Sequence, residues 1–264
     1  MIVYISILII VLSLYLLLHQ KEGFVSYNPN EYYLQSYKNV LAVRPIIGYI
    51  HICQEGEWKR SLQMILNDIK QFGLYDSTHI IRLGIVNNTG ILIKDPILND
   101  SKFQIIYVGK SSEYERPTLL HMRKAASTDN EKTRYYYLHT KGLRHFGQSS
   151  EKNVIDWIKL MLYWNVENWQ LAIKKLETYD IYGCNDTGNH YSGNFWWATR
   201  HHILQLPTTI PSHYTAPEEW IQIKRDNKFS PFNSGYQGMG HYSTRYSRDL
   251  YESASLFGSG LFRL

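Results

Sequence analysis

The chain has 264 residues, and 28 Lys and Arg against 23 Asp and Glu give it a formal net charge of +5 at pH 7. No long block of Lys or Arg accompanies this mild charge, so binding to nucleic acid is not indicated. Tyrosine and tryptophan are abundant, with 22 and 7 copies, and such rings suit contacts with sugars and nucleotides as well as a protein core.

Residues 1–20 are expected to form a transmembrane signal anchor. The run Ile2–Leu18 (IVYISILIIVLSLYLLL) is uncharged and would span about 25 Å as a helix, near the short end of what crosses a bilayer. A cleaved signal peptide is the main alternative. That alternative requires a basic start and a small-residue cleavage site, and the sequence has neither. A buried core helix is the other alternative.

The side of the membrane on which the remaining chain lies stays open. Lys21 and Lys38 follow the apolar run and favour a cytosolic domain by the positive-inside tendency. Three N-x-[ST] triplets, at Asn87, Asn99 and Asn185, favour a lumen more weakly. The two cysteines are ordinary candidates for free buried thiols and do not settle the compartment.

The next residues, 21–43, are polar and tyrosine-rich and predict a linker. Ile46–Cys53 predicts a buried strand, and Glu57–Phe72 predicts a helix with one apolar stripe, ended by a glycine. His79–Val86 and Phe103–Val108 predict two more strands. These segments begin a regular alternation of strands and helices.

The alternation continues to residue 206. Pro117–Ser127 predicts a helix that starts at its proline, Tyr135–Leu138 a strand, and Val154–Tyr179 a long amphipathic helix. Two further strands and a short helix are predicted at Asp180–Cys184, Phe195–Ala198 and His201–Leu206.

We therefore predict an α/β fold, a Rossmann-like, mostly parallel sheet flanked by helices, over residues 44–228. Residues 229–264 are rich in Gly, Ser and Tyr and predict a loop-rich C-terminal tail. Ligands of such sheets bind beyond the carboxyl ends of the strands. Candidate site residues are therefore those that follow each strand.

The first candidate stretch is Tyr135–Gly142 (YYYLHTKG), a strand that runs into polar residues. His139 and Lys141 are two residues apart and therefore share a face, and Gly142 permits close approach of the backbone. Two potentially cationic side chains beside a glycine suit a diphosphate. The alternative is a lone surface lysine next to a strand-end histidine.

The second stretch is HYSGNFWWA, residues 190–198. His190, Ser192 and Asn194 lead directly into an aromatic strand that contains Trp196. A β-turn before a core strand is the alternative. That alternative accounts for the glycine and the aromatic residues but not for the three polar side chains together.

The third stretch holds two adjacent carboxylates, Glu218 and Glu219, after the helix-starting Pro217. Their stabilisation by the helix dipole is the alternative to a catalytic role. As a general base, one of them would have its pKa raised by desolvation among Tyr214 and Trp220.

With these three stretches in order, the region from Arg44 to Ile223 resembles glycosyltransferases of the GT-A fold. It is most similar to a polysaccharide-type and viral group with HTKG and HYSGNFWWA stretches. Members normally bind a divalent metal, Mn²⁺ or Mg²⁺, through an Asp-x-Asp motif. His139-Thr140-Lys141 stands at the corresponding place, so no metal ligand is assigned and a metal requirement stays open. Lys141 would neutralise the diphosphate directly.

The resemblance implies a nucleotide-sugar-dependent glycosyltransferase, inverting, with Glu218 or Glu219 as the base. Its acceptor would be a glycan, a lipid-linked sugar or a glycoprotein. Donor-binding candidates are His139, Lys141, Asn87, Asn88, Glu55 and Arg123, with Lys124 as a weaker substitute for Arg123. Acceptor- and sugar-binding candidates are His190, Ser192, Asn194 and Trp196.

Three alternatives belong to other classes. The first is a catalytically silent, membrane-tethered module that binds a nucleotide sugar or glycan. A glycoside hydrolase would need two carboxylates facing each other across a bond, which adjacent glutamates do not normally do. A metal hydrolase would have to use His139, His190, His201 and His202, and the sequence holds no H-E-x-x-H or H-x-H pattern.

Overall fold

The computed structural model describes residues 45–224, 226–236 and 240–252. All of them belong to one unit of the chain, Leu41–Leu264. The predicted anchor at residues 1–20 and the linker at 21–43 lie outside the described residues. Within the described ranges, no helix has the length and apolar character needed to cross a membrane.

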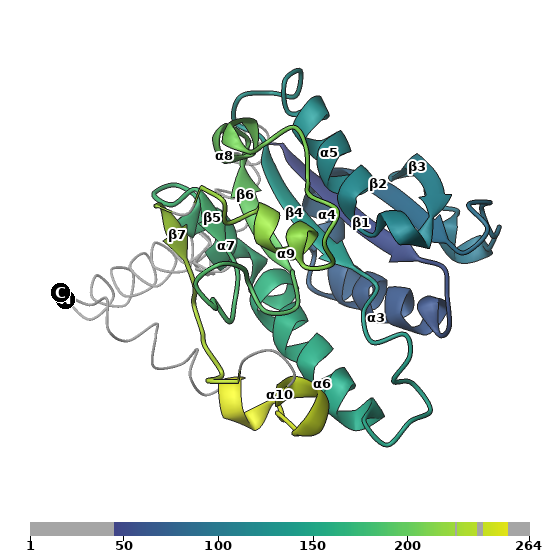
Figure 1. The fold of residues 1–264 in the computed structure, drawn as a ribbon. Coiled ribbons are helices and arrows are strands. Elements are labelled where there is room, and N and C mark those ends of the chain that lie inside the picture. The colour runs from purple at the N-terminus through teal and green to yellow at the C-terminus, as the bar shows by residue number, and fades with distance from the viewer. Residues whose placement is uncertain (1–44, 225, 237–239, 253–264) are drawn as a thin grey trace, which may run out of the picture. The chain divides into compact units, whose positions relative to one another are not determined.

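A seven-stranded sheet forms the centre, in the order β3-β2-β1-β4-β6-β5-β7 (Figure 1). Its strands are β1 (Ile46–Cys53), β2 (Thr78–Asn87), β3 (Phe103–Lys110), β4 (Arg134–His139), β5 (Ile181–Tyr182), β6 (Trp196–Thr199) and β7 (Lys228–Phe229). Strand β6 runs antiparallel to its neighbours β4 and β5, and the other pairs are parallel. The predicted mixed α/β fold with a mostly parallel sheet is confirmed.

Helices cover both faces of the sheet (Figure 1). One face carries α3 (Trp58–Gln71), α6 (Glu151–Leu162), the π-helical turn η3 (Tyr163–Glu167) and α7 (Trp169–Lys175). The other face carries α5 (Arg116–Ala125), α8 (Arg200–Gln205) and α9 (Ala216–Trp220). Short helical pieces complete the fold at α4 (Leu74–Ser77), η1 (Pro96–Leu98), η2 (Ser111–Glu113) and α10 (Gly240–Ser243).

Burial on both faces explains the apolar runs within β1 and β4. Strand β4 shows this most clearly, because alternate residues point to opposite faces. Tyr135 and Tyr137 pack against α5 and α8, whereas Tyr136 and Leu138 pack against α3 and α6. All four side chains have no exposed surface.

The prediction of a single helix over residues 154–179 is wrong. The helix begins at Glu151, and its regular turns break at η3 before α7 continues. Asparagine side chains compete with the backbone there. Asn165 Nδ2 donates to the Met161 carbonyl at 2.9 Å, and Asn168 Nδ2 donates to the Tyr163 carbonyl at 2.8 Å.

The segment that follows β7 packs on the helices of the α3–α6 face. Arg248 donates to the Glu167 carboxylate of η3 at 2.7 Å, and Arg245 pairs with Asp156 of α6. Tyr251 is buried at 1 % exposure and belongs to the core of that face. Residues 240–252 are therefore part of the packed domain.

The chain path fixes where a ligand site is expected. From β1 the chain moves to β2 and β3 on one side, and it returns to β4 on the other side of β1. The strand order therefore reverses between β1 and β4. Ligands of open α/β sheets bind at this switch point, outside the carboxyl ends of the strands.

Candidate functional site

A pocket of about 190 Å³ opens at the carboxyl ends of β1 and β4. We call it the switch-point pocket and define it by the lining residues Cys53, Glu115, His139, Lys141, Glu218 and Tyr242. These residues come from β1, from the start of α5, from the end of β4, from α9 and from α10. Segments distant in sequence thus meet at the place that the topology predicts.

Backbone contacts carry β4 into the pocket beyond its last strand residue. The Thr140 N–H donates to the His51 carbonyl of β1, and the Thr140 hydroxyl accepts from the Cys53 N–H, both at 2.9 Å. Ser61 of α3 then fixes the next residue, because its hydroxyl accepts from the Lys141 N–H at 2.9 Å and donates to the Lys141 carbonyl at 3.1 Å. The path of residues 139–141 is therefore held from both sides.

Lys141 places an ammonium group in this pocket. Its side chain is buried, at 8 % exposure, and Nζ lies 4.1 Å from the centroid of the Trp157 ring. Within the described ranges, no carboxylate lies within ion-pair distance of Nζ. A desolvated cation–π contact contributes about 2 kcal/mol, which leaves a buried charge only partly compensated. The site therefore favours an anion.

Gly142 makes the turn after Lys141. Its φ of +75° is in the region that favours glycine, and an added Cβ would lie 2.2 Å from Cγ1 of Val154. Both the backbone conformation and the close contact with α6 therefore require glycine here.

His139 joins two of the predicted stretches. Its Nε2 lies 2.9 Å from the Gly193 carbonyl oxygen, which can only accept, so Nε2 carries the proton. Burial, together with the nearby charge of Lys141, lowers the pKa of His139 to about 3. The imidazole is thus neutral at pH 7, and Lys141 is the one cation of the expected pair.

The second stretch, residues 190–198, does not line the pocket, and most of it is buried. Trp196 is fully buried, stacks on Tyr137 with ring centroids 5.0 Å apart, and donates from Nε1 to Oδ1 of Asn194 at 2.9 Å. Asn194 and Ser192 are also buried. His190 is more accessible, and its Nε2 lies 3.9 Å from Oε2 of Glu218.

The two adjacent glutamates of α9 point in different directions. Glu218 lines the switch-point pocket, and its side chain is 27 % exposed. Glu219 does not line it. The Glu219 carboxylate instead accepts from the Thr215 hydroxyl at 2.8 Å and lies 3.5 Å from Nε2 of His213. The geometry favours Glu218 over Glu219 for any role in the pocket.

Glu115 is among the residues that follow the third strand, but no pattern in the sequence assigned it a role in a site. It immediately precedes α5, its side chain is 15 % exposed, and Oε1 lies 3.9 Å from Nδ1 of His139. Burial raises the pKa of Glu115, and the charge of Glu218 adds to this effect. A hydrogen bond from the backbone N–H of Glu115 itself opposes the rise, as do the charges of Lys141 and Arg116. The available sequence signal was its position between β3 and the proline that starts α5.

The remaining donor-side candidates are less central. The Asn87 amide is fully engaged in its own turn, because Oδ1 accepts from the N–H groups of Thr89 and Gly90 and Nδ2 donates to the Ile91 carbonyl. Asn88 is exposed and accepts from the Ser111 hydroxyl at 3.0 Å. These asparagines shape the rim near β2.

Glu55 and Arg123 differ in their relation to the pocket. Glu55 follows β1, is half-buried, and lies close enough to Cys53 for its charge to raise the pKa of that thiol, after the larger effect of burial. Arg123 sits in the last turn of α5 and donates to the Leu206 carbonyl at 2.9 Å. The start of α5, not its end, faces the pocket, so Arg123 and the adjacent Lys124 lie away from it.

The donor set fits a resident divalent metal poorly. Glu115 and Nδ1 of His139 are ligand types, but the neighbouring Lys141 supplies a cation. Among the residues that the structure describes, no group of three or more His, Cys, Asp or Glu side chains is arranged to hold a metal. No chemical step is therefore assigned to a metal here.

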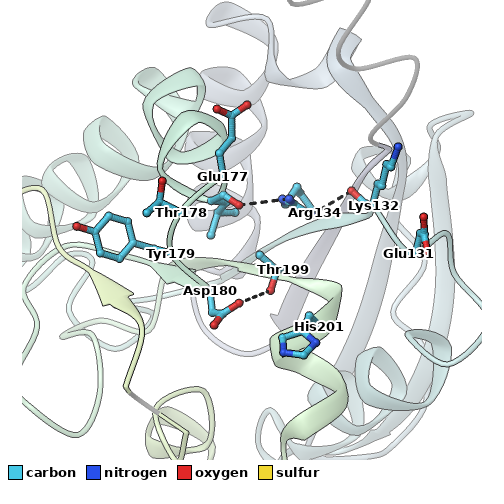
Figure 2. A pocket seen from close by; sticks show the side chains of 10 residues that line it. Glu131, Lys132, Arg134, Glu177, Thr178, Tyr179, Asp180, Thr199 and His201 are labelled. Atoms are coloured by element: carbon cyan, nitrogen blue, oxygen red, sulfur yellow. Dashed lines mark hydrogen bonds between the residues drawn. The ribbon is translucent and has the colours of Figure 1, made fainter.

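A second pocket, of about 350 Å³, lies at the end of the strands opposite to the switch-point pocket, where β4 begins and β6 ends (Figure 2). There the Thr199 hydroxyl donates to Asp180 at 3.2 Å, and His201 lies on the wall. His202 is buried, with Nε2 2.8 Å from the Ile221 carbonyl. The four histidines of the metal-hydrolase alternative are thus divided between separate places.

The sequence matches no family model, and a search of curated proteins gave no match. The geometry of the switch-point pocket is therefore the basis for assigning a function.

Proposed function

We propose that this chain is a glycosyltransferase with a GT-A-like domain, which moves a sugar from a nucleotide-sugar donor to a hydroxyl of a glycan or glycoconjugate. The observation that carries the proposal is the buried ammonium of Lys141, without a carboxylate partner in the described part of the chain, at the switch point of the sheet. A diphosphate is the anion best suited to that place.

The donor would lie with its diphosphate on Lys141. Three tyrosines line the pocket, at positions 114, 214 and 242. The rings of Tyr114 and Tyr214 meet edge to face at 5.3 Å. Such rings provide faces for a sugar or a nucleotide base.

Glu218 would serve as the general base. The acceptor oxygen forms a bond to the anomeric carbon while Glu218 takes the hydroxyl proton. The bond from that carbon to the diphosphate oxygen breaks, and its electron pair leaves with the diphosphate. Lys141 stabilises the developing charge. Because attack and departure are in line, the anomeric configuration inverts.

His190 is placed to assist Glu218. Its Nδ1 lies 2.8 Å from the amide oxygen of Asn189, which can only accept, so Nδ1 carries a proton and Nε2 faces Glu218. Nε2 can thus receive the proton that Glu218 takes from the acceptor. The side chain acts through Glu218 and is a positioning residue.

The membrane part of the proposal rests on the predicted anchor at residues 1–20. An anchored transferase acts at high local concentration on acceptors that share its bilayer. A lipid-linked sugar or a membrane glycoconjugate is therefore the acceptor class that we favour, on a side of the membrane that stays open.

A membrane-tethered module that binds the same donor without transfer is the second candidate. The observation that favours it is the position of Lys141 where a metal-binding motif is expected, since binding alone needs only the cation and the aromatic rim. Release of nucleoside diphosphate in the presence of acceptors separates the two functions.

The first experiment is a thermal-shift screen of the full-length chain in detergent against a panel of nucleotide sugars. At 100 times its Kd a ligand stabilises by about 2.7 kcal/mol, or roughly 5 to 10 °C for a domain of this size. The Lys141→Gln variant should lose the thermal shift. The Lys132→Gln variant should keep it, because Lys132 is exposed and lines the second pocket at the start of β4. A panel without any shift, or a shift that survives Lys141→Gln, contradicts the proposal.

A further inference from the structure

The switch-point pocket presents a second carboxyl group, Glu115, to the place proposed for the diphosphate. An ionised carboxylate there would repel the ligand. Either a proton or a cation must therefore compensate Glu115 when the pocket is filled. The surroundings of Glu115 indicate which one.

The tautomer of His139 gives the first indication. Because its Nε2 proton goes to the Gly193 carbonyl, the Nδ1 that faces Glu115 at 3.9 Å is a bare lone pair. Two acceptors facing each other are favourable only when one of them carries a proton. Burial keeps the pKa of His139 near 3, so a proton taken up between these two side chains goes to Glu115.

The charges around Glu115 give the second indication. Glu218 of α9 opposes its ionisation, and a diphosphate would do so more strongly. Lys141 acts on both Glu115 and His139, so a dication between these two side chains would be repelled by the ammonium. The titratable and charged groups that face Glu115 are Glu218, Lys141, Arg116, His139, Tyr137, Tyr214 and Cys53.

We propose that Glu115 takes up a proton when the diphosphate of a nucleotide sugar enters the pocket, and that its carboxyl O–H then donates a hydrogen bond to a diphosphate oxygen. The inference rests on the proposed function. The proton comes from solvent on binding, and no covalent bond changes. Lys141 supplies the charge and Glu115 supplies a hydrogen bond, which together hold the leaving group.

Calorimetric titration with the nucleotide sugar of largest thermal shift tests this coupling. Its diphosphodiester keeps a constant charge from about pH 5 to about pH 9, so proton uptake belongs to the protein. Titrations in buffers of different ionisation enthalpy should show uptake of up to about one proton near neutral pH. The Kd should rise with pH by up to about tenfold per unit above the pKa of Glu115 in the ligand-free protein.

Two variants sharpen the result. Glu115→Gln keeps a donor but cannot titrate, so binding should persist, with neither proton uptake nor a pH-dependent Kd. Glu131→Gln removes an exposed carboxylate that lines the second pocket, where β4 begins, and should behave as the parent. Binding that requires Mn²⁺ or Mg²⁺, and that Glu115→Gln abolishes at every pH, would make Glu115 a metal ligand and overturn the inference.

A ligand-free measurement separates this inference from the proposed function. The carboxyl resonance of Glu115, assigned by its loss in Glu115→Gln, should titrate above the ordinary glutamate value of about 4.3. Titration at or below that value overturns the inference, whatever the ligand. Failure of every nucleotide sugar to bind, with the raised titration present, overturns the proposed function and leaves only the raised pKa of Glu115.

Discussion

The two halves of the sheet differ in regularity. Strands β1 to β4 are all parallel and have six to ten residues each, whereas β5, β6 and β7 have four residues or fewer and include the antiparallel strand. The first half forms a rigid platform. The second half is largely loops, and loops on a rigid scaffold are where functional side chains concentrate.

The chemistry of the switch-point pocket is divided in the same way. The first half contributes Glu115, His139 and Lys141, which face the proposed diphosphate. The second half contributes Glu218, with His190 beside it, which face the proposed acceptor. The hydrogen bond from His139 to the Gly193 carbonyl joins the two parts. Substitutions in each half should therefore separate donor binding from transfer.

The largest effect is expected for Glu218→Gln. Loss of a general base lowers the rate by about 10² to 10⁴, and donor affinity should stay close to that of the parent because Lys141 is unchanged. Steady-state kinetics at saturating donor, with the donor Kd measured separately, check both expectations. Glu219→Gln is the matched control, since its carboxylate is outside the pocket. A loss of rate confined to Glu219→Gln would transfer the base to that residue.

The platform was predictable from sequence because its signals are local. The predicted strand Ile46–Cys53 has the same bounds as β1, and the predicted helix over residues 57–72 is one residue longer than α3 at each end. The break at η3 was not predictable, since it depends on where the Asn165 and Asn168 side chains find carbonyls. Strands as short as β5 and β7 hold too few residues to show a period.

The site was predictable only where its residues carry a local sequence signal. Lys141 follows a strong strand and stood out as a polar residue at a strand exit. Glu115 has no such pattern, and its raised pKa depends on burial and on Glu218, which is far away in sequence. Asn194 and Trp196 looked like site residues because they are polar or aromatic near a glycine, yet they bond to each other within the core.

A smaller effect is expected from glycine substitutions in the loop that leads from the platform. Gly142→Ala adds a Cβ 2.2 Å from Cγ1 of Val154 at a φ of +75°, so overpacking and backbone strain together should cost about 2 to 4 kcal/mol. Gly147→Ala has a similar φ of +76° and meets nothing within 4 Å. It should cost only the strain, about 1 kcal/mol. Thermal denaturation of the two variants side by side measures the difference, and equal losses would remove the steric argument.

The smallest effect is expected for Asp68, which lies on α3 near Glu167 of η3. Burial, followed by the charge of Glu167, raises the pKa of Asp68 to about 6, against the opposing charges of Lys159 and Arg248. The carboxyl binds its proton more tightly in the folded chain than in the unfolded chain. Its contribution to stability is therefore full below about pH 4 and is lost as the pH rises through about 6.

Asp68→Asn removes this titration. It should raise the free energy of unfolding at about pH 7.5 by about 1 to 2 kcal/mol, allowing for partial solvent screening, and should leave it nearly unchanged at about pH 4. Thermal midpoints of the parent and the variant at both pH values measure the change. Asp76→Asn, at an exposed position after the same helix, controls for loss of one negative charge. A gain that is equal at the two pH values would mean that charge burial between α3 and η3 is not its cause.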